Sequence, residues 1–137
     1  MLVFGHKNNK LDKLAKILGH KVHSFSLLSG HSCPYAKICN SQAVETSAGM
    51  RILDGPHTEF RCFSASQEVL FPSVYKSRKY NFDLLRQYDC GGMTDIIDAS
   101  LPKKAKCIRV HVGGDFFSQL YFDAWLRVAS RHNDIVF

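Results

Sequence analysis

The chain has 137 residues, of which 45% are hydrophobic and 22% charged, an ordinary composition for one globular domain. Its apolar runs are too short to span a bilayer and its N-terminus lacks a secretory hydrophobic segment, so we expect a cytoplasmic protein with no membrane contact. The net charge of +6 permits contact with nucleic acid without requiring it. We expect one domain over residues 1–137, with a cysteine-bearing region (1–63) followed by helices and a βαβ unit (64–137).

The first region is predicted to hold one helix and several strands. Asn9 can cap a helix that ends at Gly19, because leucines recur between them at helical spacing. In residues 21–28 polar and apolar side chains alternate loosely, which predicts a strand. Residues 50–53 and 58–63 then favour a hairpin, since the segment between them is rich in turn-forming residues.

The middle of the chain is predicted to be helical. Ser64 and Gln67 have the spacing of a capping box and open the first helix. A second helix spans residues 73–88, and Gly91-Gly92 breaks the chain after it. A third helix follows over residues 93–101, where apolar side chains share one face.

The last third indicates a βαβ unit, which requires a parallel sheet or barrel. Residues 107–112 form a strand, Ser118 caps a helix, and residues 135–137 start another strand. The predicted core face of that helix consists of Phe122, Trp125, Leu126 and Ala129. We therefore expect an α/β fold: a partial parallel βα sheet or incomplete barrel with an N-terminal cysteine loop and hairpin region. Because the chain stops as a strand begins, we expect self-association to complete the sheet, or a longer family fold.

Three of the five cysteines, Cys33, Cys39 and Cys62, lie in or beside predicted loops, from which thiolates reach a metal easily. They could hold a four-iron cluster with one open iron, or zinc with His31 or His57 as fourth ligand. The alternative is that they are small buried thiols. Cys90 and Cys107 lie in predicted regular structure, so we expect them to be packing residues.

The strand over residues 107–112 predicts a second feature of the site. Its alternation places Cys107, Arg109 and His111 on one polar face, which suggests a lumen or cleft for a polar ligand, or otherwise a solvent-facing edge. The turn Gly113-Gly114 would let a ligand approach the backbone, with Asp115 accepting from an amine or hydroxyl; the alternative is a plain turn.

Two basic clusters could contact phosphates and stacked bases: residues 75–80, where cations alternate with aromatics, and Lys103, Lys104 and Lys106. The first cluster could equally be the solvated face of a helix and the second an exposed loop. We favour this interpretation over contact with nucleic acid.

Residues 31–34, 58–66 and 109–118 look like sequence blocks of a bacteriophage family of unassigned function called gene product 88. The resemblance covers residues 21–137. It implies a phage-encoded protein that acts in the cytoplasm of the infected host cell.

That family is similar in turn to radical S-adenosylmethionine enzymes. This implies that Cys33, Cys39 and Cys62 hold a 4Fe-4S cluster. It also implies that Gly113, Gly114 and Asp115 contact the methionine moiety of S-adenosylmethionine.

Two hypotheses follow from the sequence. In the first, the protein is a radical-type iron–sulfur protein, an enzyme or a degenerate relative, whose substrate would react near Arg109 and His111. In the second, it is not an enzyme: an iron–sulfur or zinc site stabilises the fold, and the basic surface binds nucleic acid or a host protein.

Overall fold

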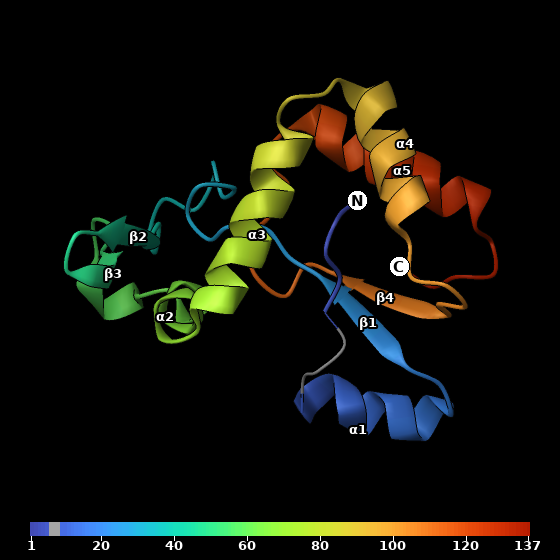
Figure 1. Ribbon diagram of the computed structural model, residues 1–137, viewed down its shortest axis with the longest axis horizontal. Helices are drawn as coiled ribbons and strands as arrows, with labels where there is room; N and C mark the ends of the chain where they lie inside the picture. Colours follow the sequence, from blue (N-terminus) through green and yellow to red (C-terminus); the bar gives the residue numbers. More distant parts are fainter. Residues whose placement is uncertain (6–8) are drawn as a thin grey trace.

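The computed structural model describes residues 1–5 and 9–137 and shows a mixed α/β arrangement (Figure 1). The regular elements, in chain order, are α1 (Asn9–Leu18), β1 (Val22–Phe25), β2 (Gln42–Thr46), β3 (Gly49–Leu53), a short 3-10 helix (Thr58–Phe60), α2 (Phe63–Leu70), α3 (Pro72–Leu85), α4 (Cys90–Ser100), β4 (Cys107–Val110) and α5 (Gln119–Arg131). Figure 1 shows the hairpin and α2 at one end, the strands β1 and β4 with α5 at the other, and α3 between them.

The parallel sheet predicted from the sequence is confirmed. β1 pairs in parallel with β4, from Val22 beside Cys107 to Phe25 beside Val110. On the other side of β4, Cys107 makes a parallel bridge to Val136, where the sequence predicted a strand. In the part of the chain that the structure describes, the strands form two two-stranded sheets and no closed barrel.

The helix α5 begins where predicted but buries a different face. Ser118 caps it, since its Oγ accepts from the backbone N–H of Tyr121 at 3.2 Å. The buried residues are Tyr121, Ala124, Trp125 and Val128, whereas Phe122 and Leu126 of the predicted face are exposed. Trp125 and Tyr121 face the sheet, where Trp125 packs edge-on against Phe25 of β1, so the position of Phe25 sets the rotation of the helix.

The predicted hairpin between residues 50–53 and 58–63 is wrong, because the first of these strands pairs with a different segment. β3 pairs antiparallel with the preceding β2 rather than with residues 58–63, which begin as a 3-10 helix. The turn forms because Gly49 adopts φ +108°, a conformation open to glycine, and Thr46 Oγ1 donates to the carbonyl of Gly49 at 2.7 Å.

Three predicted boundaries are also corrected. Gly91 and Gly92 do not break the chain, because α4 starts at Cys90 and Asp89 caps it by accepting from the Gly92 N–H at 2.8 Å. Ser64 does not cap α2; it lies inside the helix, where its Oγ accepts a hydrogen bond from Arg78. Asn9 is the first residue of α1, and the position before it falls outside the described residues.

The hydrophobic core lies between α3, α4, α5 and the parallel strands, and it includes Phe25, Leu85, Ile97 and Tyr121. Cys90 belongs to this core, as predicted for a packing residue. No helix among the described residues has the length and apolar character needed to cross a membrane.

Candidate metal and cofactor site

The loop after β1 runs from Ser29 to Asn40 and carries two of the predicted cysteine ligands. It is a series of turns, and Ser29 and Ser32 at its start are fully buried. Ser32 Oγ donates to the carbonyl of Leu28 at 2.8 Å and accepts from the backbone N–H of Asp115 at 3.2 Å. One hydroxyl therefore joins the cysteine loop to the Gly-Gly-Asp turn that follows β4.

Cys39 and Cys62 are brought together by a buried serine. Ser41 Oγ donates to the carbonyl of Cys39 at 2.9 Å and accepts from the backbone N–H of Cys62 at 3.2 Å. Gly55 adds a second close approach, because a Cβ there would lie 2.3 Å from the carbonyl oxygen of Cys39. Residues 23 positions apart in the chain are thus held against one another.

Cys33 lies within electrostatic range of the other parts of the site. Burial raises the pKa of its thiol, and the nearby charges of Asp115 and Cys62 raise it further, against opposing hydrogen bonds from Gly30 and Ser32. A cation bound here would favour the thiolate and reverse this shift. Cys33, Cys39 and Cys62 are all free and half-buried.

The two glycines of the predicted ligand turn are needed for close packing. A Cβ on Gly113 would lie 2.1 Å from Ser64 Oγ and 2.8 Å from Arg78 Nη1. Gly114 has φ +75°, and a Cβ there would lie 2.5 Å from Ser32 Oγ. The glycines therefore let the turn sit directly on the cysteine loop and on α2.

Asp115, the acidic residue of the turn, is exposed. Its Oδ1 accepts from the backbone N–H of Phe116 at 2.8 Å. Within the described residues its Oδ2 has no protein partner, so one carboxylate oxygen is open to an external donor.

Beneath the site lies a buried ion pair that the sequence analysis missed. Glu68 of α2 accepts through Oε1 from Arg78 Nη1 at 2.8 Å and from the N–H and hydroxyl of Ser29, at 3.1 and 2.8 Å. Arg78 Nη1 also donates to Ser64 Oγ at 2.7 Å. The signal was present in the sequence, because Arg78 falls at the helical spacing of the buried Tyr75 and Phe82.

Arg109 and His111, the candidate catalytic residues, lie in different surroundings. Arg109 is exposed, and its Nε donates to the carbonyl of His111 at 3.3 Å. The ring of His111 is largely buried among aromatic side chains, and a 2.9 Å hydrogen bond joins its Nε2 to Tyr121 Oη. Burial lowers the pKa of His111 to about 4, partly offset by Asp115, so its ring is neutral near pH 7.

Most of the first basic cluster does not form a free cationic face. Tyr75 and Arg78 are buried, and Lys79 forms an ion pair with Asp83 one helical turn further on. In the second cluster Lys106 pairs with Asp134 at 3.1 Å, while Lys103 and Lys104 are exposed.

Over residues 1–5 and 9–137, no three His, Cys, Asp or Glu side chains are grouped so as to hold a single metal ion. This arrangement does not fit zinc held by the three cysteines and His31 or His57. His57 instead faces Glu59, with 3.7 Å between Nδ1 and Oε1. Beside Cys39 there is an open hollow of about 640 Å³, bounded by residues 35–39 on one side and by Phe60 and Arg61 on the other.

The fold and site define a small α/β protein in which a cysteine loop and a Gly-Gly-Asp turn meet at the end of a parallel strand pair. The chain belongs to the gene product 88 family, since the sequence model of that family, described as Gene product 88, matches residues 2–137.

Curated relatives come from bacteriophages, in agreement with the phage origin that the resemblance implied. The chain is similar to the Gene 88 protein of Mycobacterium phage D29, with 32% identity over 85 residues, 56% of this chain and 35% of the relative. It is also similar to the Gene 88 protein of Mycobacterium phage L5, with 29% identity over 85 residues, 56% of this chain and 36% of the relative. The matched region thus spans about a third of the length of these relatives. No solved structure matches the chain.

Proposed function

We propose that this phage protein binds an iron–sulfur cluster through Cys33, Cys39 and Cys62 and that the turn Gly113-Gly114-Asp115 binds a cofactor of the S-adenosylmethionine type beside it. The observation that carries the proposal is the convergence of three distant segments. Ser41 joins Cys39 to Cys62, and Ser32 joins the Cys33 loop to Asp115.

The arrangement of the cysteines suits a cluster better than one ion. The sulfur ligands of a single tetrahedral ion must crowd around one centre, whereas each thiolate of a four-iron cluster binds its own iron and stands further from the others. Cys33 lies within electrostatic range of Cys62, and no group fit for a single ion occurs among the described residues. The hollow beside Cys39 leaves room on that side of the loop.

The chain's own groups would orient the cofactor. Asp115 Oδ2 would accept from the amino group of an amino-acid moiety. Gly113 and Gly114 would contribute indirectly, because their close packing holds Asp115 beside the cysteine loop. A cluster held by Cys33, Cys39 and Cys62 would supply single-electron chemistry when bound. Arg109, which is exposed, remains the candidate to contact a substrate, while the enclosed ring of His111 would hold the wall of the site in place.

Anaerobic reconstitution with iron and sulfide tests the cluster. We expect a brown protein with about four irons and four sulfides per chain and a broad absorption near ~400 nm. Cys33→Ser, Cys39→Ser and Cys62→Ser should each lower the bound iron, whereas Cys107→Ser, a half-buried cysteine in β4, should not.

Three results would contradict the proposal: a colourless reconstituted protein, one zinc per chain in place of iron, or equal iron in all four variants. Cofactor binding is tested separately, by release of methionine or 5′-deoxyadenosine from S-adenosylmethionine under reducing conditions. A loaded cluster without this release, together with salt-dependent binding of DNA or RNA, would support the non-enzymatic alternative instead.

A further inference from the structure

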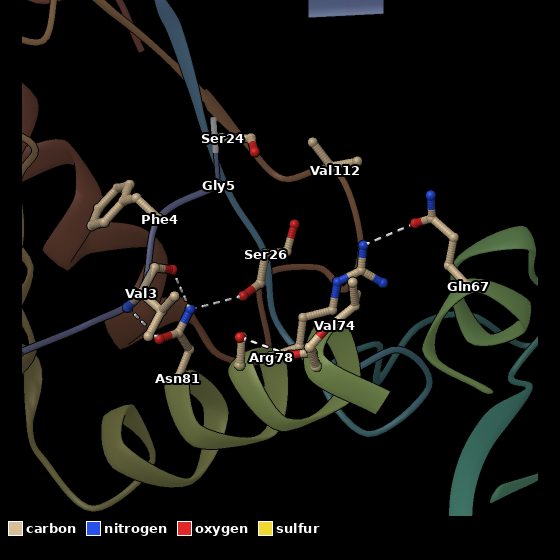
Figure 2. Close-up of a pocket in the computed structure, with 12 residues that line it drawn as sticks. Val3, Phe4, Gly5, Ser24, Ser26, Gln67, Val74, Arg78, Asn81 and Val112 are labelled. Carbon is tan, nitrogen blue, oxygen red and sulfur yellow. Dashed lines mark hydrogen bonds between the residues drawn. The ribbon is translucent and has the colours of Figure 1, made fainter. Parts of the chain in front are cut away.

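A second cavity lies beside the Gly-Gly turn, since Val112, the residue before Gly113, is one of its lining residues (Figure 2). Its volume is about 340 Å³, the size of sites that hold small organic ligands. The N-terminal segment, β1 with the residues after it, α2 and α3 all contribute walls. Figure 2 shows Phe4 and Gln67 on opposite sides of the cavity, with Arg78 between them.

Several hydrogen-bond donors in the walls have no partner. The Oγ of Ser24 and of Ser73, the side-chain N–H₂ of Gln67 and the Nε–H of Arg78 donate to no acceptor in the described part of the chain. Other polar side chains in the walls already make hydrogen bonds inside the protein. Asn81, for example, holds Val3 through both its amide oxygen and its amide nitrogen.

The free groups match an acceptor-rich ligand. No Asp or Glu side chain among the described residues lines the cavity. Glu68 does not line the cavity, and it holds the guanidinium of Arg78 by accepting from Nη1 at 2.8 Å. Ser73 lies in the first turn of α3, where the helix dipole adds positive potential, although the N–H groups of Val74 and Tyr75 already donate to the carbonyl of Phe71, at 2.9 and 3.2 Å.

Apolar side chains also line the cavity, namely Val3, Phe4, Val74 and Val112. A ligand of matching chemistry has a compact apolar body and an oxygen-rich end. We propose that this cavity binds a small organic anion, with its carboxylate or phosphate at Gln67, Ser73 and Arg78 and its apolar part against Phe4.

This proposal does not depend on the cluster. The two sites nevertheless share a wall, because Val112 lines the cavity while the adjoining Gly113 packs on Arg78. A molecule bound in the cavity would therefore lie beside the turn that we assign to the cofactor.

Titration of the ¹⁵N-labelled chain with two matched pairs of probes tests the proposal. Lactate is compared with 1,2-propanediol, and glycerol 3-phosphate with glycerol, so that each pair differs in the anionic group. We expect one of the anions to shift the signals of the Ser73 amide and the Gln67 side-chain amide, with Kd of about 1 mM or below. The uncharged partner should leave them unchanged. The responding pair identifies the group as carboxylate or phosphate.

Ser73→Asp separates binding from folding. A carboxylate in the first turn of α3 favours the helix dipole, so the unfolding midpoint should hold or rise. The same charge at the cavity should weaken anion binding ~tenfold or more, since like charges would lie within a few ångströms. Ser47→Asp adds an equal charge on the exposed β2–β3 turn and should bind as the unaltered chain does.

The proposal is overturned if neither anion binds at about 10 mM, a concentration at which a site of ~1 mM affinity is mostly filled. Equal shifts from an uncharged partner would overturn it as well. So would unchanged anion affinity in Ser73→Asp.

Discussion

The guanidinium of Arg78 donates to the carboxylate of Glu68 at 2.8 Å, and both side chains are almost fully buried. This pair connects α3 to α2, and through Ser29 and Gly113 it supports both the cysteine loop and the ligand turn. Glu68 Oε2 is buried without a protein partner in the described residues, so the pair is incompletely satisfied and sensitive to change.

Arg78→Met should destabilise the protein by about 3–5 kcal/mol, because it leaves the Glu68 carboxylate buried and unpaired. Glu68→Leu combined with Arg78→Met should recover much of that loss, since no buried charge then remains. Lys79→Met serves as the control, because its exposed pair with Asp83 is worth about 0.5 kcal/mol or less. Urea unfolding measures all three, and equal losses in the single variants would contradict the role of the buried pair.

Gly113→Ala should destabilise the protein by about 2 kcal/mol or more, because its Cβ would collide with Ser64 Oγ and Arg78 Nη1. Gly91→Ala is the matched glycine, since the nearest atom to a Cβ there is 3.5 Å away and the position is helical. It should be neutral or stabilising by up to about 1 kcal/mol. Thermal unfolding distinguishes them, and a stable Gly113→Ala variant would show that the turn can move away from α2.

Asn81→Asp should release the N-terminal segment from α3. The side-chain nitrogen of Asn81 donates to the carbonyls of Val3 and Ser26, at 2.9 and 3.2 Å. A carboxylate would face these two carbonyl oxygens without a donor, at a cost of about 2–3 kcal/mol. Hydrogen exchange at the Val3 amide should accelerate, whereas Asn133→Asp, at an exposed position, should leave it unchanged.

Ser41→Ala should lower the iron content after reconstitution more than its effect on stability explains. The change removes the hydroxyl that joins Cys39 to Cys62 and leaves the Cys62 N–H without its acceptor, which costs about 1–3 kcal/mol. Ser130→Ala, whose exposed hydroxyl bonds to the carbonyl of Arg127, is the control. Full iron loading in folded Ser41→Ala would show that the serine bridge does not position these cysteines.

Stability should fall as the pH drops from about 6.5 to about 4. The pKa of His111 is lowered to about 4 in the folded chain, so the unfolded chain binds the extra proton first over this interval. The loss amounts to roughly 2–3 kcal/mol for a shift of this size. His111→Gln should flatten the slope of the unfolding free energy in this window. Carboxylates whose pKa is lowered in the folded chain, such as Asp98, stabilise it until the pH falls below their ordinary pKa. Their loss of stabilisation therefore begins at a lower pH than the loss caused by His111.

Local patterns predicted the helices better than they predicted strand pairing. The helices α1 and α3 lie within a few residues of the predicted ranges, and Ser118 caps α5 as predicted. The prediction that β3 pairs with residues 58–63 was wrong. Both this segment and β2 adjoin β3 in the chain, and the tight turn at Gly49 favours pairing with β2. The core face of α5 was misassigned because Phe122 and Tyr121 are both apolar, and the choice depends on the packing against Phe25.

By itself the sequence determined the α/β class, the presence of parallel strands and the residues that resemble gene product 88, because these depend on spacing along the chain. Only the tertiary structure decided that Ser41 joins Cys39 to Cys62 and that Arg78 neutralises Glu68 beneath the Gly-Gly turn. These contacts join residues that lie in different segments of the sequence, and no periodic pattern of residue types along the chain predicts that they meet. They form because burial leaves each polar group no water to bond with, and the folded chain must supply the partner.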